Sequence, residues 1–327
     1  MRTAIHQSMG QPEQVLEIRN VVRPAPQAGE VLLQMILAPI HNHDLMQISG
    51  TYGIKPELPA RAGTEAVGRV LAVGEGVTHL QVGQRVSVSG AFGTWADAFV
   101  APAGQVLPVP DGISDELAAQ LLIMPTSAMV VLDDLGVQSG QWMMLNAAAG
   151  AVGKNVALLA AARNIRVIAL VNQDAQVEEL RKLGVDVVEN TTVDGWQARI
   201  KAALNGEPLL HALDSVAGSL TGQMLHVMDD NATLVVFGAL SNQPLNIDFQ
   251  DVLFKQATVR GFWGLRKVEK LSDAYRARMV AEILAIAQRN GFNLPVAAVY
   301  DLGDVAMASG IRSSAGKVLL RGGHSEF

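Results

Sequence analysis

The sequence predicts an α/β fold in which a doubly wound parallel-sheet domain accompanies an irregular, mainly antiparallel β domain. Two observations predict it. Residues 1–100 read as short strands separated by glycine and proline turns, whereas from residue 141 onwards short apolar strands alternate with helices. Strands that are apolar on both faces and alternate with helices are typical of a parallel sheet covered on both sides. The length of 327 residues is sufficient for two such domains.

In the first half, apolar runs bounded by glycine or proline predict strands. The segment 84–89 alternates polar and apolar residues, as expected of a strand with one buried face. The strands predicted in this half cover residues 30–37, 68–73, 84–89 and 97–101. Ser114, followed by two acidic residues, predicts the N-cap of a helix over 117–124.

From residue 141 the pattern becomes strand, helix, strand. Apolar runs predict the strands, runs of helix-forming residues predict the helices, and one helix ends at Gly184. The predicted strands cover 142–145, 166–171, 185–188, 212–215, 233–237 and 316–320. The predicted helices cover 155–163, 177–183 and 269–289.

The composition narrows the classes of protein. Hydrophobic residues make up 49% of the chain and charged residues 17%, which predicts a globular rather than a disordered protein. The formal net charge of −6 argues against a general nucleic-acid-binding protein, which needs a basic face. The absence of cysteine excludes disulfides, four-cysteine zinc sites and thiolate nucleophiles.

The sequence also carries expectations about location. The N-terminus lacks the apolar core of a signal peptide. No run approaches the roughly 18 consecutive apolar residues of a membrane span. We therefore expect a cytoplasmic protein with no membrane or nucleic-acid partner.

The turn after the strand 142–145 is the strongest functional signal. Its spacing, Ala147-x-x-Gly150-x-x-Gly153, is a variant of the dinucleotide-binding fingerprint with alanine at the first small position. Gly150 lacks the Cβ atom that would keep the backbone away from a pyrophosphate, and Gly153 permits close packing of helix and strand. The helix N-terminus then presents N–H groups to the phosphates. We predict a Rossmann-type nucleotide site that includes Ala149, Gly150, Ala151, Val152 and Gly153. The alternative is a tight turn in an ordinary α/β domain.

The end of the following strand bears on the choice of cofactor. Dehydrogenases selective for NAD usually carry an acidic residue there, which binds the ribose 2′-hydroxyl. Here the chain reads Val171-Asn172-Gln173, so a 2′-phosphate is tolerated, although Asp174 is unfavourable to it and no arginine is at this end. The prediction is NADPH, with Asn172 among its binding residues and NADH as the alternative.

Several segments together resemble the medium-chain dehydrogenase/reductase superfamily, and the resemblance covers essentially the whole chain. The pattern is similar to the zinc-independent branch that contains quinone oxidoreductases and trans-2-enoyl thioester reductases. The order of the segments is more specific than any one of them. They are Gly63-Thr64-Glu65-Ala66-Val67-Gly68, Val82-Gly83-Gln84-Arg85-Val86, the turn 147–153, Leu213-Asp214-Ser215-Val216-Ala217-Gly218 and Gly261-Phe262-Trp263.

The resemblance implies a domain organisation and an assembly. It implies a catalytic domain made of residues 1–117 and 268–327, and a dinucleotide-binding domain over 118–267 with a six-stranded parallel sheet. An active site in the cleft between these domains and a homodimer are also expected by resemblance.

The resemblance also bears on metal binding. Zinc alcohol dehydrogenases of this superfamily use a cysteine and the histidine of a Gly-His-Glu run, but this chain has Gly63-Thr64-Glu65 and no cysteine. His41 and His43 would share one face of a strand, yet two histidines without a third ligand make a poor zinc site. We therefore expect no metal, and a positioning or pocket role for this segment.

The segment 41–52 carries the predicted chemistry. It resembles a stretch of thioester reductases that begins Asn-Pro-Ser-Asp and ends Gly-x-Tyr: Asp44, Gly50 and Tyr52 match, whereas His41 replaces the asparagine. A phenol has an ordinary pKa near 10, so it is neutral at pH 7 and can donate a proton to a developing enolate. Tyr52 is therefore the predicted proton donor, or the residue that positions the thioester carbonyl. The alternative is that Tyr52 stacks in a surface loop.

Other candidates come from the resemblance or from strand ends. Ser127 stands where the family has a threonine near the nicotinamide ribose, and Lys317 is a candidate for cofactor contact. Phe262 and Trp263 resemble aromatic residues beside the nicotinamide, with a buried core as the equal alternative. The strand ends add Ser215, Val216, Phe237 and Gly238 on the cofactor side, and the predicted substrate pocket comprises His41, Trp95 and Trp263.

Three functions stay open at this point. The first is an NADPH-dependent, metal-independent reductase that transfers hydride to a conjugated C=C, above all in a 2-enoyl thioester. The second is an NADPH:quinone oxidoreductase, which needs no dedicated acid because a quinone product can take protons from water. The third is a non-catalytic NADPH-binding protein, against which the retained Tyr52 and the glycine turn argue. A small-molecule acceptor is the partner in the first two.

Overall fold

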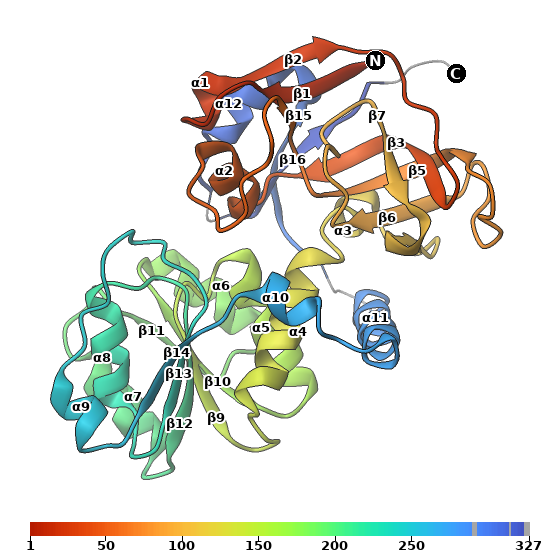
Figure 1. The fold of residues 1–327 in the computed structure, drawn as a ribbon. Helices are drawn as coiled ribbons and strands as arrows, with labels where there is room; N and C mark the ends of the chain where they lie inside the picture. Colours follow the sequence, from red (N-terminus) through yellow and green to blue (C-terminus); the bar gives the residue numbers. More distant parts are fainter. Residues whose placement is uncertain (290–292, 314, 324–327) are drawn as a thin grey trace. The chain divides into compact units, whose positions relative to one another are not determined.

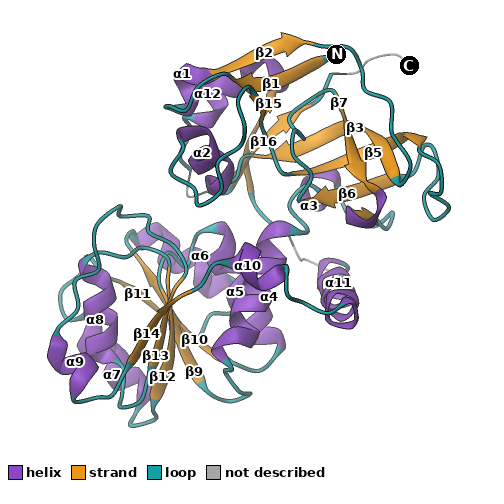
Figure 2. Cartoon of the chain, viewed as in Figure 1, coloured by secondary structure: helices purple, strands orange, loops and turns teal. Residues whose placement is uncertain are grey.

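The computed structural model describes residues 1–289, 293–313 and 315–323. The chain divides into two units, one made of Met1–Ile123 with Val280–Phe327 and the other of Met124–Met279. Figure 1 follows the chain through both units, and Figure 2 distinguishes their helices from their strands.

The observed boundaries of the units differ from those expected at residues 117 and 268. Residues 118–123 belong to the first unit, because two backbone amides of this segment donate to Glu65. Residues 268–279 belong to the second unit, because the Tyr275 hydroxyl binds Asp133 there.

The second unit is a parallel sheet with helices on both faces, which confirms the predicted fold class. The strand order is β11-β10-β9-β12-β13-β14, with parallel pairing throughout. The strands are β9 (Trp142–Leu145), β10 (Arg166–Val171), β11 (Val187–Asn190), β12 (Leu209–Asp214), β13 (Thr233–Val236) and β14 (Thr258–Gly261). The helices are α4 (Ile123–Leu135), α5 (Ala151–Ala162), α6 (Asp174–Lys182), α7 (Trp196–Leu204), α8 (Ser219–Val227), α9 (Phe249–Leu253) and α10 (Gly264–Val268). Figure 1 shows α7 and α8 on one face of the sheet and α4 and α5 on the other.

Apolar side chains build the core of this unit. Met144 in the central strand β9 pairs in register with Ile168 of β10 and Ala212 of β12. On one face, Trp196 of α7 and Met224 of α8 join the same buried cluster. Because the strands are parallel, their carboxyl ends meet at one edge of the sheet, and the turns that follow them gather there.

The first unit contains two sheets. The smaller has the order β2-β1-β4, and the larger has the order β15-β16-β3-β5-β6-β8, with β7 also pairing with β3. Pairing in the described residues is antiparallel apart from β15 with β16. The strands are β1 (Arg2–His6), β2 (Leu16–Asn20), β3 (Glu30–Pro39), β4 (Ala60–Arg61), β5 (Glu65–Val73), β6 (Arg85–Ser89), β7 (Ala98–Pro102), β8 (Val106–Pro108), β15 (Val296–Asp301) and β16 (Lys317–Arg321). The helices are α1 (Pro12–Val15), α2 (Asn42–Ser49), α3 (Asp115–Ala118) and α12 (Val305–Ser309), and α11 (Asp273–Ala287) crosses the boundary between the units.

Two predicted helices were wrong in extent. The helix expected over 117–124 is interrupted: α3, capped by the Ser114 hydroxyl as predicted, ends at Ala118, and α4 begins at Ile123. The helix expected over 269–289 starts later, as α11, because the Ser272 hydroxyl accepts an amide of its first turn.

None of the helices in the described ranges is both long and apolar enough to span a membrane.

Candidate functional site

The turn between β9 and α5 leaves room for a ligand at the start of a helix. Ala147 has a φ of 48°, a left-handed conformation that is uncommon for alanine. Gly150 is the N-cap of α5 and contributes no side-chain cap. A Cβ on Gly153 would lie 2.5 Å from the carbonyl oxygen of Ala148, so a larger residue would displace the turn. The first amides of α5 therefore follow a tight turn without a side-chain cap, which is the arrangement that binds a pyrophosphate.

A buried hydrogen-bond network joins this turn to the loop after β12. Asn146 Nδ2 donates to Asp214 Oδ1 over 2.6 Å, and the Ser215 amide donates to Asn146 Oδ1 over 2.6 Å. Asp214 also accepts the Val216 amide at 2.8 Å and the Thr221 hydroxyl at 2.5 Å. The network fixes the backbone of Ser215 and Val216, two predicted cofactor residues, relative to the glycine turn.

The chain after β13 and β14 brings aromatic residues together. The Phe237 amide donates to the Asp214 carbonyl over 2.7 Å, and the Gly238 amide over 3.2 Å. The Phe237 ring stacks on Phe262, with 5.7 Å between the ring centroids. Phe262 is buried, whereas Trp263 is 37% exposed. Trp263 is therefore the most exposed member of this aromatic group, and Phe237 is partly exposed.

Ser127 lies near the same group. A Cβ built on Gly264 would be 3.4 Å from the Phe262 ring and 3.8 Å from the Ser127 hydroxyl oxygen. The second unit thus brings together residues from three separate predictions: the glycine turn, the strand ends and the aromatic pair.

The segment after β10 has exposed polar residues. Asn172 and Gln173 are exposed, and the Asn172 amide approaches Gln176 Oε1 at 3.4 Å. Asp174 Oδ1 accepts the Asn190 side-chain amide over 2.7 Å. The Asp174 carboxylate, which follows the end of β10, therefore already has a hydrogen-bond partner within the protein.

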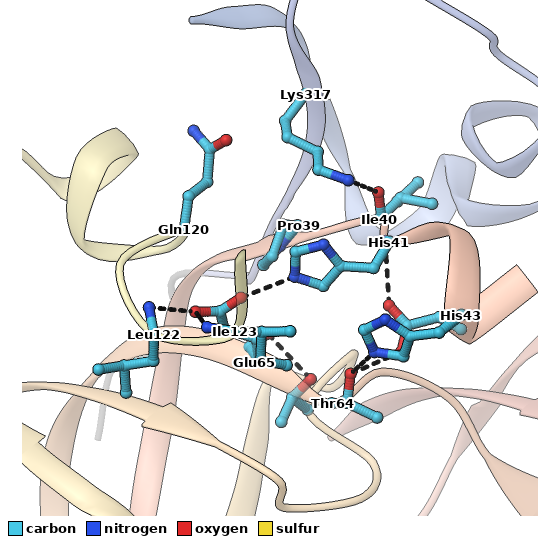
Figure 3. Close-up of polar contacts among 12 residues, drawn as sticks. Pro39, Ile40, His41, His43, Thr64, Glu65, Gln120, Leu122, Ile123 and Lys317 are labelled. Carbon is cyan, nitrogen blue, oxygen red and sulfur yellow. Dashed lines mark hydrogen bonds and ion pairs between the residues drawn. The ribbon is translucent and has the colours of Figure 1, made fainter. Parts of the chain in front are cut away.

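In the first unit, a histidine and a glutamate form a fully buried pair (Figure 3). His41 is the N-cap of α2 and Glu65 begins β5; His41 Nε2 lies 2.7 Å from Glu65 Oε2. Glu65 Oε1 accepts the amides of Leu122 at 2.7 Å and Ile123 at 3.0 Å. Burial raises the pKa of Glu65 to about 7. Burial, and after it the charge of Lys317, holds the pKa of His41 well below its usual value. The pair is a neutral histidine beside a carboxyl group that titrates near neutral pH.

A second polar chain runs beside this pair. His43 Nε2 lies 2.7 Å from Thr64 Oγ1, which donates to Asp44 Oδ1 over 2.7 Å. Asp44 Oδ2 accepts the backbone amide of His41 and so closes a capping box at the start of α2. The His43 ring stacks on His41 with a centroid distance of 5.0 Å, and its centroid is 6.2 Å from that of Tyr52. The predicted proton donor therefore has an imidazole as its neighbour.

Two further candidate residues of the first unit, Lys317 and Trp95, donate side-chain hydrogen bonds to backbone carbonyl groups. Lys317 Nζ donates to the Ile40 carbonyl over 3.3 Å, and burial lowers its pKa. Trp95 is fully buried, and its indole N–H donates to the Pro39 carbonyl over 3.1 Å. Trp95 belongs to the apolar core of this unit. Packing accounts for its position, and its role in a substrate pocket stays a prediction.

Sequence reasoning assigned no role to the partners that position these residues. Thr64 and Glu65 lie in the segment Gly63-Thr64-Glu65, which was used to recognise the resemblance and to argue against zinc. Asp214 lies in the segment 213–218, in which only Ser215 and Val216 were given a role. His43 was weighed as a metal ligand, and its segment was given a positioning or pocket role without a named partner. The types of these residues could have indicated the network. A threonine and an acid in the segment 63–65 and two histidines in the segment 41–44 can form hydrogen bonds with one another if the fold brings the two segments together.

Within the ranges that the structure describes, no three histidine, aspartate or glutamate side chains are grouped so as to hold a metal ion. The histidines and acids around β5 instead bind one another and the backbone, as Figure 3 shows.

Comparison with family models matches both units. Residues 27–111 match the model of the alcohol dehydrogenase GroES-like domain, and residues 151–285 match that of the zinc-binding dehydrogenase. The second family is named for zinc binding, but its match covers none of the histidines of the first unit.

Curated relatives and solved structures extend the comparison over nearly the whole chain. A mitochondrial enoyl-[acyl-carrier-protein] reductase from Dictyostelium discoideum is 31% identical over 295 residues, which covers 88% of this chain and 84% of the relative. A Bacillus thuringiensis structure described as an NADPH:quinone reductase superposes with a TM-score of 0.89 at 26% identity, covering 98% of both chains. A mycobacterial structure complexed with NADPH has a TM-score of 0.86 at 26% identity, covering 98% of this chain and 100% of that one.

Proposed function

Because the chain belongs to the medium-chain dehydrogenase/reductase superfamily, in its zinc-independent branch of quinone and enoyl reductases, we propose that it reduces a 2-enoyl thioester with NADPH. The membership confirms the resemblance of the sequence. The observation that carries the proposal is the position of Tyr52, which follows the end of α2 with its ring centroid 6.2 Å from that of His43. The chain is 31% identical to an enoyl-[acyl-carrier-protein] reductase.

The residues of the second unit fit a dinucleotide. Gly153 has no space for a Cβ atom, and the start of α5 has no side-chain cap, so the amides after Gly150 are suited to a diphosphate. Bound NADPH would supply the hydride for the reaction. The backbone of Ser215 and Val216, held by Asp214, is suited to line the ribose and nicotinamide side.

The proposed preference for NADPH over NADH is based on the residues that follow β10. An NAD-selective site would carry a carboxylate ready to accept the ribose 2′-hydroxyl. Here Asn172 and Gln173 are exposed, and Asp174 is engaged by Asn190. The mycobacterial structure at 26% identity is complexed with NADPH, which supports the same choice.

Tyr52 is proposed as the proton donor. Hydride addition at the β-carbon of an enoyl thioester moves the π electrons toward the carbonyl, and the α-carbon then takes a proton. A neutral phenol can release that proton to the enolate as the new C–H bond forms. The thioester carbonyl needs a hydrogen bond while it carries charge, and the Tyr52 hydroxyl can also provide it.

A quinone is the second candidate acceptor. The Bacillus thuringiensis structure described as an NADPH:quinone reductase covers 98% of this chain, which favours it. A reduced quinone takes its protons from water, so this reaction would not depend on Tyr52. A catalytic role, on either acceptor, is favoured over cofactor binding alone because the relatives carry the names of reductases.

We propose that the protein forms a homodimer whose interface includes the β14 edge of the parallel sheet. β14 ends the strand order, and an edge strand can pair with a second copy. The neighbouring α9 region exposes a group of large apolar side chains, and such a group marks an interface. The group is Leu240, Leu245, Phe249, Val252, Leu253 and Phe254. The D. discoideum relative is named as mitochondrial, so a cytoplasmic location remains a prediction for this chain.

An acceptor panel tests the proposed function. Purified protein is assayed for NADPH and NADH oxidation with crotonyl thioesters, a naphthoquinone and simple enones. The proposal expects the highest kcat/KM with a crotonyl thioester and NADPH. Turnover of the naphthoquinone alone would replace the thioester by a quinone, and nucleotide binding without any turnover would leave only a binding protein.

A further inference from the structure

The hydrogen bonds around Thr64 define which nitrogen of His43 carries a proton. The Thr64 hydroxyl has a single hydrogen and donates it to Asp44 Oδ1 over 2.7 Å. Toward His43 Nε2, 2.7 Å away, the Thr64 oxygen can therefore only accept. Nε2 must carry a hydrogen, and Nδ1 is left as the nitrogen that takes up and releases the exchangeable proton.

The hydrogen-bonded series Asp44–Thr64–His43 is fixed in place by the contacts of Asp44. Asp44 is buried, and its second oxygen accepts the backbone amide of His41 over 3.0 Å. His43 Nε2 also lies 3.5 Å from Asp44 Oδ1. A buried carboxylate behind an imidazole fixes the orientation of the ring.

The other charged groups near His43 come from three elements. His41, stacked on one face of the ring, is held neutral by its burial. Glu65 of β5 is paired with His41, and Lys317 of β16 donates to the Ile40 carbonyl. A positive His43 therefore meets a neutral ring on one side and the Asp44 carboxylate behind Thr64.

His43 also has access to protons from solvent and a route to Tyr52. Its side chain is 21% exposed, unlike those of His41 and Asp44. Its ring centroid is 6.2 Å from that of Tyr52, with 43° between the ring planes, so the two side chains are neighbours.

We propose that His43, oriented by the Thr64 hydroxyl and the Asp44 carboxylate, is a proton relay that restores the Tyr52 hydroxyl in each catalytic cycle. The proposal rests on the function argued above, with Tyr52 as the donor. His43 acts through Tyr52 and is thus a positioning residue for the reaction.

The proposed steps balance in protons and electrons. The hydride brings two electrons and one hydrogen to the β-carbon, and the C=C π pair becomes the enolate. The Tyr52 O–H bond breaks as the α-carbon–hydrogen bond forms, which leaves a phenolate. The Nδ1–H of the His43 imidazolium then gives its proton to the phenolate, and neutral His43 is reprotonated by solvent hydronium or buffer acid, which supplies the one proton that the reduction consumes.

The test compares His43→Gln with the parent enzyme on two acceptors. The Gln side-chain amide can still donate to Thr64, but it does not titrate. The proposal expects kcat for crotonyl thioester to fall at least about tenfold, with little change in KM and none in naphthoquinone turnover. The parent kcat should fall as pH rises and the acid form of His43 is lost, and this ionisation should be missing in His43→Gln.

Control variants show whether a loss of activity is specific to His43 and Thr64. His79→Gln changes an exposed histidine of the same unit and should match the parent. Thr64→Ser keeps the hydroxyl and should retain activity, whereas Thr64→Val removes the acceptor and should lower kcat on the thioester as His43→Gln does. Thermal melting and NADPH binding establish that each variant is folded.

The outcomes separate the relay from the proposed function. No turnover of crotonyl thioester by the parent would overturn both. Parent turnover with an unchanged pH profile in His43→Gln would overturn the relay alone, and would assign the ionisation to Glu65. An equal loss on thioester and quinone would also overturn it, because a structural defect would explain that result.

Discussion

Each unit buries a carboxylate at one end of a strand, Glu65 in β5 and Asp214 in β12, and surrounds it differently. Asp214 accepts hydrogen bonds from the Asn146 and Thr221 side chains and from backbone amides of the following loop. Glu65 accepts two amides on one oxygen and faces the neutral His41 on the other. Burial raises the pKa of Glu65 to about 7.

The difference indicates two uses of a buried acid. Donors on both oxygens of Asp214 hold the loops beside the glycine turn, where a cofactor needs a fixed backbone. Glu65 instead has a pKa raised to about 7 by burial, and it lies beside the histidines to which we assign proton transfer. Positioning and proton transfer are thus assigned to different units.

Removal of Asp214 should have the largest effect. Asp214→Ala leaves buried donors of Asn146, Thr221 and the loop without an acceptor, so the free energy of unfolding should fall by roughly 4 kcal/mol. Urea denaturation measures it, and the exposed Asp230→Ala is the control. A loss no greater than that of the control would show that Asp214 does not hold the loops.

Glu65 should make stability depend on pH. Its pKa is raised from 4.5 to about 7, so between these values the folded state keeps a proton that the unfolded state has lost. Stability therefore falls as pH rises through this window, by on the order of 3 kcal/mol for this group. Glu65→Gln should remove that dependence in urea denaturation at pH 5 and pH 8. Exposed Glu75→Gln is the control, and an unchanged slope in Glu65→Gln would contradict the assignment.

Gly153 tests the cofactor turn. Gly153→Ala would put a Cβ within 2.5 Å of the Ala148 carbonyl oxygen, so the turn must move. We expect NADPH affinity to fall about a hundredfold, or roughly 2.7 kcal/mol. Fluorescence titration measures it. Gly104→Ala, which meets no atom within 4 Å, should leave the affinity unchanged. Parent-like binding by Gly153→Ala would remove the turn from the cofactor site.

The substitution of Tyr52 should distinguish a thioester from a quinone as the acceptor. Its expected effect on turnover is the smallest of the effects predicted here. Tyr52→Phe removes the hydroxyl and keeps the ring, so thioester turnover should fall at least about tenfold. Naphthoquinone turnover should stay close to the parent value. Steady-state kinetics on both acceptors measures the contrast, and an unchanged thioester rate would exclude Tyr52 from the mechanism.

The strands of the parallel sheet could be predicted best from the sequence. The segments 142–145 and 166–171 are apolar throughout, and β9 and β10 have these same bounds. The strand expected at 185–188 is observed as β11, two residues further on. The strands that were not predicted are β1, β2, β4, β8, β14 and β15. The two-residue β4, for example, is identified only by its pairing with β1, which lies far away in the chain.

Long-range hydrogen bonds explain what the sequence could not predict. The helix expected over 117–124 is interrupted where the Leu122 amide binds Glu65, which is 57 residues away in the chain. A local pattern contains no information on such a partner. The same explanation holds for the candidate site. The glycine turn is formed by consecutive residues and could be predicted, whereas the Thr64–His43 contact joins two segments that are distant in the chain and could not be predicted.

The most direct test follows the hydride itself. NADPH dideuterated at C4 is incubated with the protein and a crotonyl thioester, and the product is analysed by mass spectrometry and NMR, with and without a chelator. The account predicts one deuterium at the β-carbon, a solvent-derived hydrogen at the α-carbon, and the same yield with chelator. No deuterium in the product, or loss of the reaction on chelation, would contradict it.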